Sequence, residues 1–129
     1  MARTVLFDGI GEGSYVTFLS ALVKHTDEDK LVYVSANGTV ALCAEDAYFF
    51  GVVRVIDDFD KSASVQIDGF VTMSFDPAHS DPALGWNGFT AGVTPDLVKV
   101  TAAADGKPMY WVVSFDATNH TVTFKLDPY

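Results

Sequence analysis

Apolar and polar residues alternate with a period of two along most of this chain. The longest example is residues 64–75, where alternate positions on one face are apolar and Gly69 interrupts that face. Alternation of this kind is typical of strands with one buried face, and an isolated glycine inside it indicates a bulge or a close backbone approach. The apolar positions of this face are Val65, Ile67, Val71, Met73 and Phe75.

Two segment pairs predict β-hairpins. Asn37-Gly38 separates the apolar runs 30–34 and 39–43, and an Asn-Gly pair between two such runs is the strongest short hairpin signal. Near the end of the chain, the run 109–115 is followed by turn residues and then by the alternating segment 121–126. We therefore expect a second hairpin there.

Three other segments are less regular. Residues 15–25 fit either a strand or a short turn of helix, with Ser14 as a possible cap. Residues 48–56 are nearly all apolar, which predicts a central strand covered on both sides. Residues 76–93 are rich in Pro, Gly and Ser, which predicts a long loop carrying Trp86 and Phe89.

These elements predict a mainly β fold, a small single-domain β-barrel or β-sandwich with a long loop and an extended N-terminal segment. We expect residues 1–29 to be an N-terminal arm or irregular segment packed on the domain, and residues 30–129 to form the β-rich domain. No internal repeat is evident in the sequence.

The composition and net charge of the chain limit the classes of partner that we expect. The chain has 129 residues, 49% of them hydrophobic and 19% charged, which is enough for one folded core and unlike a disordered chain. Its net charge of −9 repels phosphate backbones and acidic lipids, so we expect neither nucleic acid nor membrane partners. Residues 1–14 lack the apolar stretch of a secretory signal, and the single cysteine, Cys43, lies in an apolar run typical of a buried thiol.

Two acidic clusters are candidate metal ligands. The cluster at residues 57–60 has three carboxylates but lacks the glycine and distal glutamate of a calcium loop, so a solvated turn is favoured. Asp76, His79 and Asp81 combine an imidazole with two carboxylates, although a surface turn is the favoured interpretation. Neither cluster predicts a metal site.

Catalytic signatures are weak. The three histidines, at positions 25, 79 and 120, lie in no nucleophile motif, and the glycine-rich segment 9–14 lacks the spacing and the lysine of a phosphate-binding loop. We therefore expect no enzyme activity and no cofactor. Trp111 lies in an apolar strand and is predicted to be core, while Trp86 is either an anchor for a partner or a loop residue tucked onto the core.

Five segments have strand patterns that occur together in a known family; they are residues 50–57, 63–71, 85–87, 110–116 and 121–126. With these segments the chain resembles the capsid decoration, or cement, proteins of tailed bacteriophages. The resemblance covers about the last two-thirds of the chain and contains no active-site signature.

The resemblance implies a small β-barrel or β-sandwich that binds the outer surface of the major capsid protein, as a homotrimer, and stabilises the shell of the virion without catalysis or cofactor. The first 29 residues depart from the smallest family members, and the extended segment around Val5 could pair with a capsid strand. The alternative is a carbohydrate- or receptor-binding domain of a virion surface or tail structure, with Trp86 and Phe89 as its platform. The candidate capsid or subunit contacts are Thr4, Val5, Leu6, Phe7, Trp86 and Phe89.

Overall fold

The computed structural model describes residues 14–78, 80–101 and 107–126, and within these ranges the chain forms ten β-strands and no helix. The strands of the first half are β1 (Tyr15–Ser20), β2 (Leu31–Ala36), β3 (Thr39–Leu42), β4 (Gly51–Asp57) and β5 (Ser62–Gln66). Those of the second half are β6 (Phe70–Phe75), β7 (Gly85–Ala91), β8 (Leu97–Thr101), β9 (Met109–Asp116) and β10 (Thr121–Lys125).

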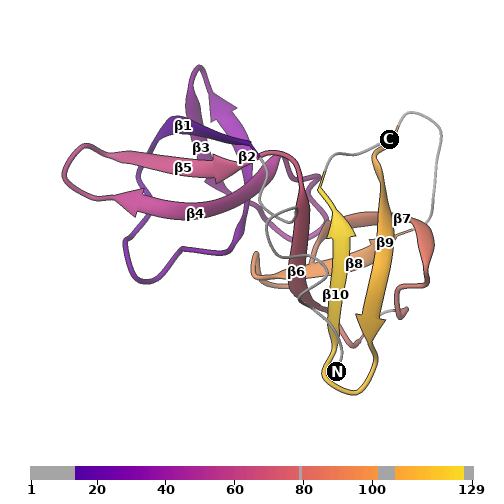
Figure 1. Cartoon of the computed structure of the whole chain (residues 1–129). Helices are drawn as coiled ribbons and strands as arrows, with labels where there is room; N and C mark the ends of the chain where they lie inside the picture. Colours follow the sequence, from indigo (N-terminus) through magenta and orange to yellow (C-terminus); the bar gives the residue numbers. More distant parts are fainter. Residues whose placement is uncertain (1–13, 79, 102–106, 127–129) are drawn as a thin grey trace, which may run out of the picture.

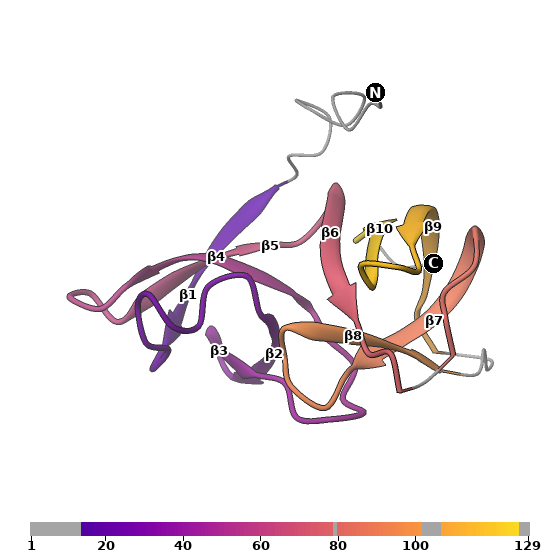
Figure 2. The same cartoon turned by 90° about the horizontal axis from the view of Figure 1, so that it is seen from below.

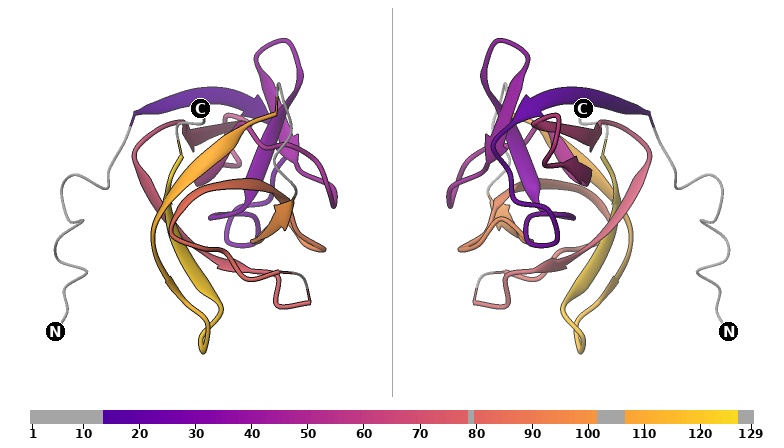
Figure 3. Two further views of the ribbon diagram at one scale, coloured as in Figure 1. Left: turned by 90° about the vertical axis from the view of Figure 1, so that its right-hand side faces the viewer. Right: turned by 90° about the vertical axis from the view of Figure 1, so that its left-hand side faces the viewer.

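The two sets of strands close into two small barrels that lie side by side (Figures 1 and 2). The strand order is β1-β3-β2-β4-β5 in the first barrel and β10-β6-β8-β7-β9 in the second. Strands β9 and β10 curve along one another on one flank of the second barrel (Figure 3). The mainly β, barrel-type fold predicted from the sequence is therefore confirmed.

Both barrels have the same topology. In each, the first strand runs parallel to the third and antiparallel to the fifth, and every other neighbouring pair is antiparallel. Each barrel also carries a register shift at the same place, between its fourth and fifth strands. The two halves of the chain thus repeat one fold, although no internal repeat was expected from the sequence.

Individual residues can be matched between the two barrels. Residues 52–67 align with residues 111–126 without a gap, and their inward positions are apolar in both copies. Equivalent backbone hydrogen bonds support this match. The pairs of bonds are Ile67 N to Ser14 O (2.9 Å) and Leu126 N to Gly69 O (2.7 Å), and Ser20 N to Lys61 O (3.0 Å) and Phe75 N to His120 O (2.9 Å).

Each barrel has its own core, but the second core extends into the first barrel. Val32, Val53 and Val65 belong to the cluster inside the first barrel. Leu31 and Val52 point out of that barrel and pack in the cluster of the second, together with rings such as Phe89 and Phe124. The two barrels therefore share a continuous apolar junction.

Polar contacts reinforce this junction. The connection between β3 and β4 pairs with the end of β7, where Asp46 N donates to Ala91 O at 3.0 Å and Ala91 N donates to Ala47 O at 2.9 Å. The ammonium of Lys99 lies 3.3 Å from a Glu45 carboxylate oxygen and also pairs with Asp46. These contacts position the β3–β4 connection against the second barrel.

Three expectations need correction. Residues 76–93 are not all loop, because residues 85–91 form β7 and pair with β8 and β9. The alternation over residues 64–75 belongs to two strands in different barrels, and Gly69, with φ 86°, lies where the chain passes between them. Residues 48–56 are not covered on both sides, since Phe50 and Val55 are exposed and β4 begins at residue 51.

Both predicted hairpins are confirmed. The hairpin at Asn37-Gly38 is confirmed as β2–β3, with Gly38 at φ 63°, and the C-terminal hairpin is confirmed as β9–β10. Of the two readings of residues 15–25, the strand is the observed one. This strand is part of the first barrel, so residues 15–20 belong to the β-rich domain and not to the N-terminal segment expected over residues 1–29. Residues 1–13 lie outside the described ranges.

Candidate functional site

The acidic cluster at residues 57–60 forms a turn. One carboxylate oxygen of Asp57 accepts hydrogen bonds from the backbone N–H groups of Phe59 (2.9 Å) and Asp60 (3.2 Å), which closes the turn between β4 and β5. Asp116 forms the equivalent turn between β9 and β10 by accepting from Thr118 and Asn119. The role of Asp57 is therefore local structure.

The second acidic cluster is only partly described. Asp76 is buried, and its carboxylate accepts a hydrogen bond from the backbone N–H of Ala78 at 3.0 Å. His79, the imidazole of the candidate set Asp76, His79 and Asp81, lies outside the described residues. Among the residues that the structure describes, no three His, Cys, Asp or Glu side chains gather closely enough to hold a metal ion.

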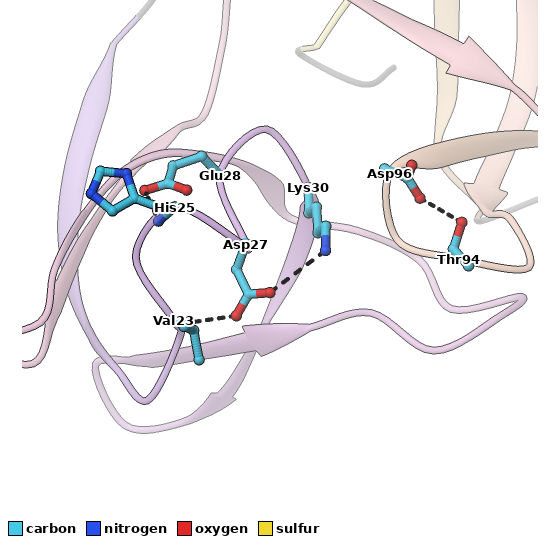
Figure 4. A network of polar contacts seen from close by, with 7 residues as sticks. All are labelled: Val23, His25, Asp27, Glu28, Lys30, Thr94 and Asp96. Atoms are coloured by element: carbon cyan, nitrogen blue, oxygen red, sulfur yellow. Dashed lines mark hydrogen bonds and ion pairs between the residues drawn. The ribbon is translucent and has the colours of Figure 1, made fainter.

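The loop between β1 and β2 contains His25 and several acids. Asp27 accepts a hydrogen bond from Val23 N at 2.8 Å and lies 3.6 Å from the ammonium of Lys30 (Figure 4). Glu28 accepts one from the backbone N–H of His25 at 3.0 Å. These contacts are local, so they fix the shape of the loop.

Cys43 is buried, as predicted. Burial raises the pKa of its thiol to about 12, because the thiolate would lose its hydration. The thiol therefore stays protonated at neutral pH and is a poor nucleophile. The glycine-rich segment 9–14 lies outside the described residues except for Ser14.

The two tryptophans form a pair on the outside of the second barrel. Trp86 on β7 is opposite Trp111 on β9, and their rings meet edge to face with centroids 4.9 Å apart. They are 46% and 44% exposed, so the prediction that Trp111 is core is wrong, and Trp86 lies on a strand rather than a loop. Phe89 is fully buried and cannot serve as a surface platform. Thr4, Val5, Leu6 and Phe7 lie outside the described residues.

A second exposed apolar group lies on the first barrel, and sequence reasoning missed it. We call it the distal patch, because the β4–β5 turn that carries Phe59 lies at the end farthest from the second barrel (Figures 1 and 2). Its exposed fractions are 94% for Phe59, 61% for Val55, 58% for Leu19 and 55% for Val23.

Strand register and loop contacts bring these side chains together. On β5, the neighbouring outward residues Ser62 and Ser64 are opposite Leu19 and Val55, respectively. The loop that follows β1 reaches the β4–β5 turn, where Lys24 N donates to the carboxylate of Asp58 at 3.1 Å. The distal patch thus consists of exposed apolar side chains from β1, the loop after it, β4 and the β4–β5 turn.

The duplicated fold provides an internal reference for this patch. Three patch residues, Leu19, Val55 and Phe59, have an equivalent position in the second barrel. There the side chains are small and carry a hydroxyl group. An apolar side chain is therefore not required for the barrel to form at these positions. The equivalent pairs are Leu19 and Ser74, Val55 and Ser114, and Phe59 and Thr118.

Comparisons with known proteins give no family for this chain. No protein-family model matches it, and a search of curated proteins finds no match. Across residues 14–78, 80–101 and 107–126, there is also no helix of the length and apolarity needed to cross a membrane.

Proposed function

We propose that this protein is a non-catalytic capsid decoration protein that attaches to the major capsid protein of a tailed bacteriophage through the distal patch of its first barrel. The sequence resemblance suggests the class of partner. The exposed side chains suggest the surface that meets it.

The observation that carries the proposal is the difference between the two barrels at equivalent positions. Leu19, Val55 and Phe59 are exposed and apolar, where the second barrel has Ser or Thr. Exposing large apolar side chains costs free energy in water, and contiguous groups of them mark protein interaction sites. Because the fold does not require them, a partner that buries them is the physical reason for their presence.

Phe59 suits the role of an anchor. It stands at a turn that is held by Asp57, so its backbone is ordered before any partner binds. Preorganisation lowers the entropy lost on binding, and aromatic side chains are enriched among the residues that dominate interface energy.

The charge of the chain fits this arrangement. A net charge of −9 opposes contact with packaged DNA, and a decoration protein on the outside of a shell does not meet the genome. A capsid presents many identical sites, so contacts that are weak singly would gain strength from trimerisation and from the symmetry of the shell.

For the alternative, a carbohydrate- or receptor-binding domain, the structure changes which aromatic residues could form the binding platform. Phe89 is buried and therefore cannot be part of the binding platform. Trp111, which is opposite Trp86, is half-exposed and would replace Phe89 in it. We rank the capsid proposal first, because the exposed apolar residues Leu19, Val55 and Phe59 replace Ser or Thr of the second barrel.

Binding to expanded empty heads of the phage or prophage that encodes the chain tests the proposal. Wild-type protein should co-sediment with the heads and raise the temperature at which they dissociate. The double variant Val55→Ser with Phe59→Ala should lose about tenfold or more in affinity, since each truncated interface anchor typically costs more than 1 kcal/mol.

The second barrel provides the matched control. The double variant Ser114→Ala with Thr118→Ala changes the equivalent positions and should bind heads like the wild type. The proposal would be contradicted if the heads did not bind the wild-type protein, or if they bound the Val55/Phe59 variant with unchanged affinity.

A further inference from the structure

The β4–β5 and β9–β10 turns have the same backbone conformation, so their side chains can be compared directly. In each turn an aspartate, Asp57 or Asp116, accepts hydrogen bonds from the backbone N–H groups two and three residues later. The last residue of each turn lies in the left-handed region, with φ 54° at Lys61 and φ 56° at His120. Side chains that differ between the two turns are therefore not required by the turn itself.

The β4–β5 turn lacks an interaction that the other turn has. Asn119 donates a side-chain hydrogen bond to the carboxylate of Asp116 at 2.8 Å, and Asp60 occupies the equivalent position in the first barrel. An ionised carboxylate has no hydrogen to donate, so Asp60 cannot make this bond to Asp57 and instead places a second negative charge in the same turn. The acid at position 60 therefore weakens the turn in which it lies.

A second acid and an aromatic ring complete the difference between the turns. Asp58 and Phe59 stand where the β9–β10 turn has Ala117 and Thr118. Phe59 is 94% exposed, and the exposed acids Asp58 and Asp60 precede and follow it at the end of the first barrel farthest from the second (Figures 1 and 2). We call residues 58–60 the tip of the distal patch.

The acids of the tip keep their charge uncompensated within the chain. Among the described residues, no ammonium or guanidinium group lies within ion-pair distance of Asp58 or Asp60. Asp58 accepts a hydrogen bond from the backbone N–H of Lys24, which orders it without neutralising it. A carboxylate that loses its hydration in an interface is destabilising unless a cation of the partner replaces the water. A partner that covers Phe59 must therefore supply cations beside it.

We propose that the tip docks into an apolar pocket of the major capsid protein whose rim carries lysine or arginine side chains. The ring of Phe59 fills the pocket, and the carboxylates of Asp58 and Asp60 pair with the rim. This inference rests on the proposed function and specifies the partner surface that meets the distal patch. An apolar centre within a polar rim is the common arrangement of protein interfaces, in which rim charges select the partner and speed association.

A basic protein surface suits the tip better than a metal ion does. The carboxylate of Asp57 is already used by the turn, and in the ranges that the structure describes no three acidic, histidine or cysteine side chains gather around one point. A fully solvated ring between two acids contributes nothing to ion binding, whereas exposed aromatic side chains are common anchors of protein interfaces.

The salt dependence of binding to expanded empty heads separates charge pairing from apolar contact. Wild-type affinity should fall as the salt concentration rises to about 1 M, where the screening length is about 3 Å. The double variant Asp58→Ala with Asp60→Asn gives the tip the residues of the β9–β10 turn. It should bind about tenfold more weakly than wild type at low salt and equally at about 1 M, because only the charge contribution is removed.

Two further variants serve as controls. Asp81→Asn with Asp96→Asn removes the same charge from exposed positions outside the tip and should bind heads like the wild type, which separates local pairing from net charge. Phe59→Ala should bind more weakly at every salt concentration, because salt does not screen the contact of the ring.

Thermal unfolding of the same variants tests the tip without any capsid. Asp58→Ala with Asp60→Asn restores a side-chain donor for Asp57 and removes the neighbouring negative charge, so it should melt at a higher temperature than wild type. A lower melting temperature would mean that the acids serve the fold, and it would overturn the inference.

The binding outcomes distinguish this inference from the proposed function. Heads that bind the Asp58/Asp60 variant as tightly as wild type, or more tightly, would overturn the basic rim and leave the capsid proposal intact. Binding that requires calcium and is abolished by EDTA would assign the acids to a bridging metal ion instead. Heads that do not bind wild-type protein at any salt concentration would overturn the capsid proposal, and the basic rim with it.

Discussion

At the scale of single residues, a comparison of equivalent positions in the two barrels distinguishes side chains that the fold requires from side chains that it does not. Asp57 and Asp116 are identical, and each closes a turn with its carboxylate. Val53 and Val112 are identical and buried. Positions such as Leu19 and Ser74 differ in polarity although their strand register is the same. The first kind of position is set by folding, and the second is free to be set by a partner.

Asp116 provides a test at this scale. Hydrogen bonds from the backbone and side chain of Asn119, and from the backbone of Thr118, lower the pKa of its carboxyl group because they favour the charged form. A carboxyl group with a lowered pKa stabilises the fold above its ordinary pKa of about 3.9, and this stabilisation is lost as the pH falls through the lower value.

We therefore expect Asp116→Ala to lower the melting temperature at pH 7 and the difference from wild type to shrink in strong acid. Asp116→Asn keeps an oxygen acceptor and should lie between the two. Thermal unfolding followed by circular dichroism at several pH values measures this, and a constant difference at all pH values would contradict the assignment.

At the scale of elements, the close pairing of β4 with β5 depends on a residue without a side chain. A Cβ atom on Gly51 would meet the carbonyl oxygen of Gln66 and would lie 2.7 Å from Cγ1 of Val65. Both neighbours belong to β5, and one of them is backbone that cannot turn away. The first residue of β4 therefore allows the two strands to approach.

Gly51→Ala should destabilise the protein by about 1–3 kcal/mol, the usual cost of overpacking a filled site. Urea unfolding measures this difference. Ser64→Ala, a change of similar size on the outward side of β5, is the control and should stay within about 0.5 kcal/mol of wild type. Equal stability of the two variants would show that β4 and β5 can separate at little cost.

At the scale of the whole molecule, the two barrels are joined by side chains that point out of one and into the other. Leu31 and Val52 lie on β2 and β4 of the first barrel but pack in the core cluster of the second. Lys99 supports the same junction through the carboxylates of Glu45 and Asp46. Because the core of the second barrel includes residues of the first, we expect the barrels to unfold together.

Leu31→Ala tests this coupling. Truncating a fully buried leucine typically costs about 2–5 kcal/mol, and the loss should shift a single unfolding transition as a whole. Val55→Ala, at a position 61% exposed, should change stability by less than about 0.5 kcal/mol. Calorimetry with two separate transitions, of which only one moves in Leu31→Ala, would instead mean that the barrels fold independently.

The sequence by itself determined much of the local structure. The β class, both hairpins and the buried thiol followed from alternation, from Asn37-Gly38 and from the apolar run around Cys43, because turn chemistry and the alternation of side chains between two faces act over a few residues. A gapless comparison of residues 52–67 with residues 111–126 would also have revealed the repeat, through its shared inward apolar positions and the matching turn aspartates.

Only the tertiary structure decided which apolar residues are covered. Phe89 and Trp111 look alike in sequence, yet the first points into its barrel and the second points out of it. Leu31 also points out of its barrel, but the other barrel covers it. Alternation specifies two faces of a strand and not what lies against each face. The half-exposed tryptophan pair and the distal patch formed only when the barrels closed and docked, since exposure depends on contacts between residues far apart in the chain.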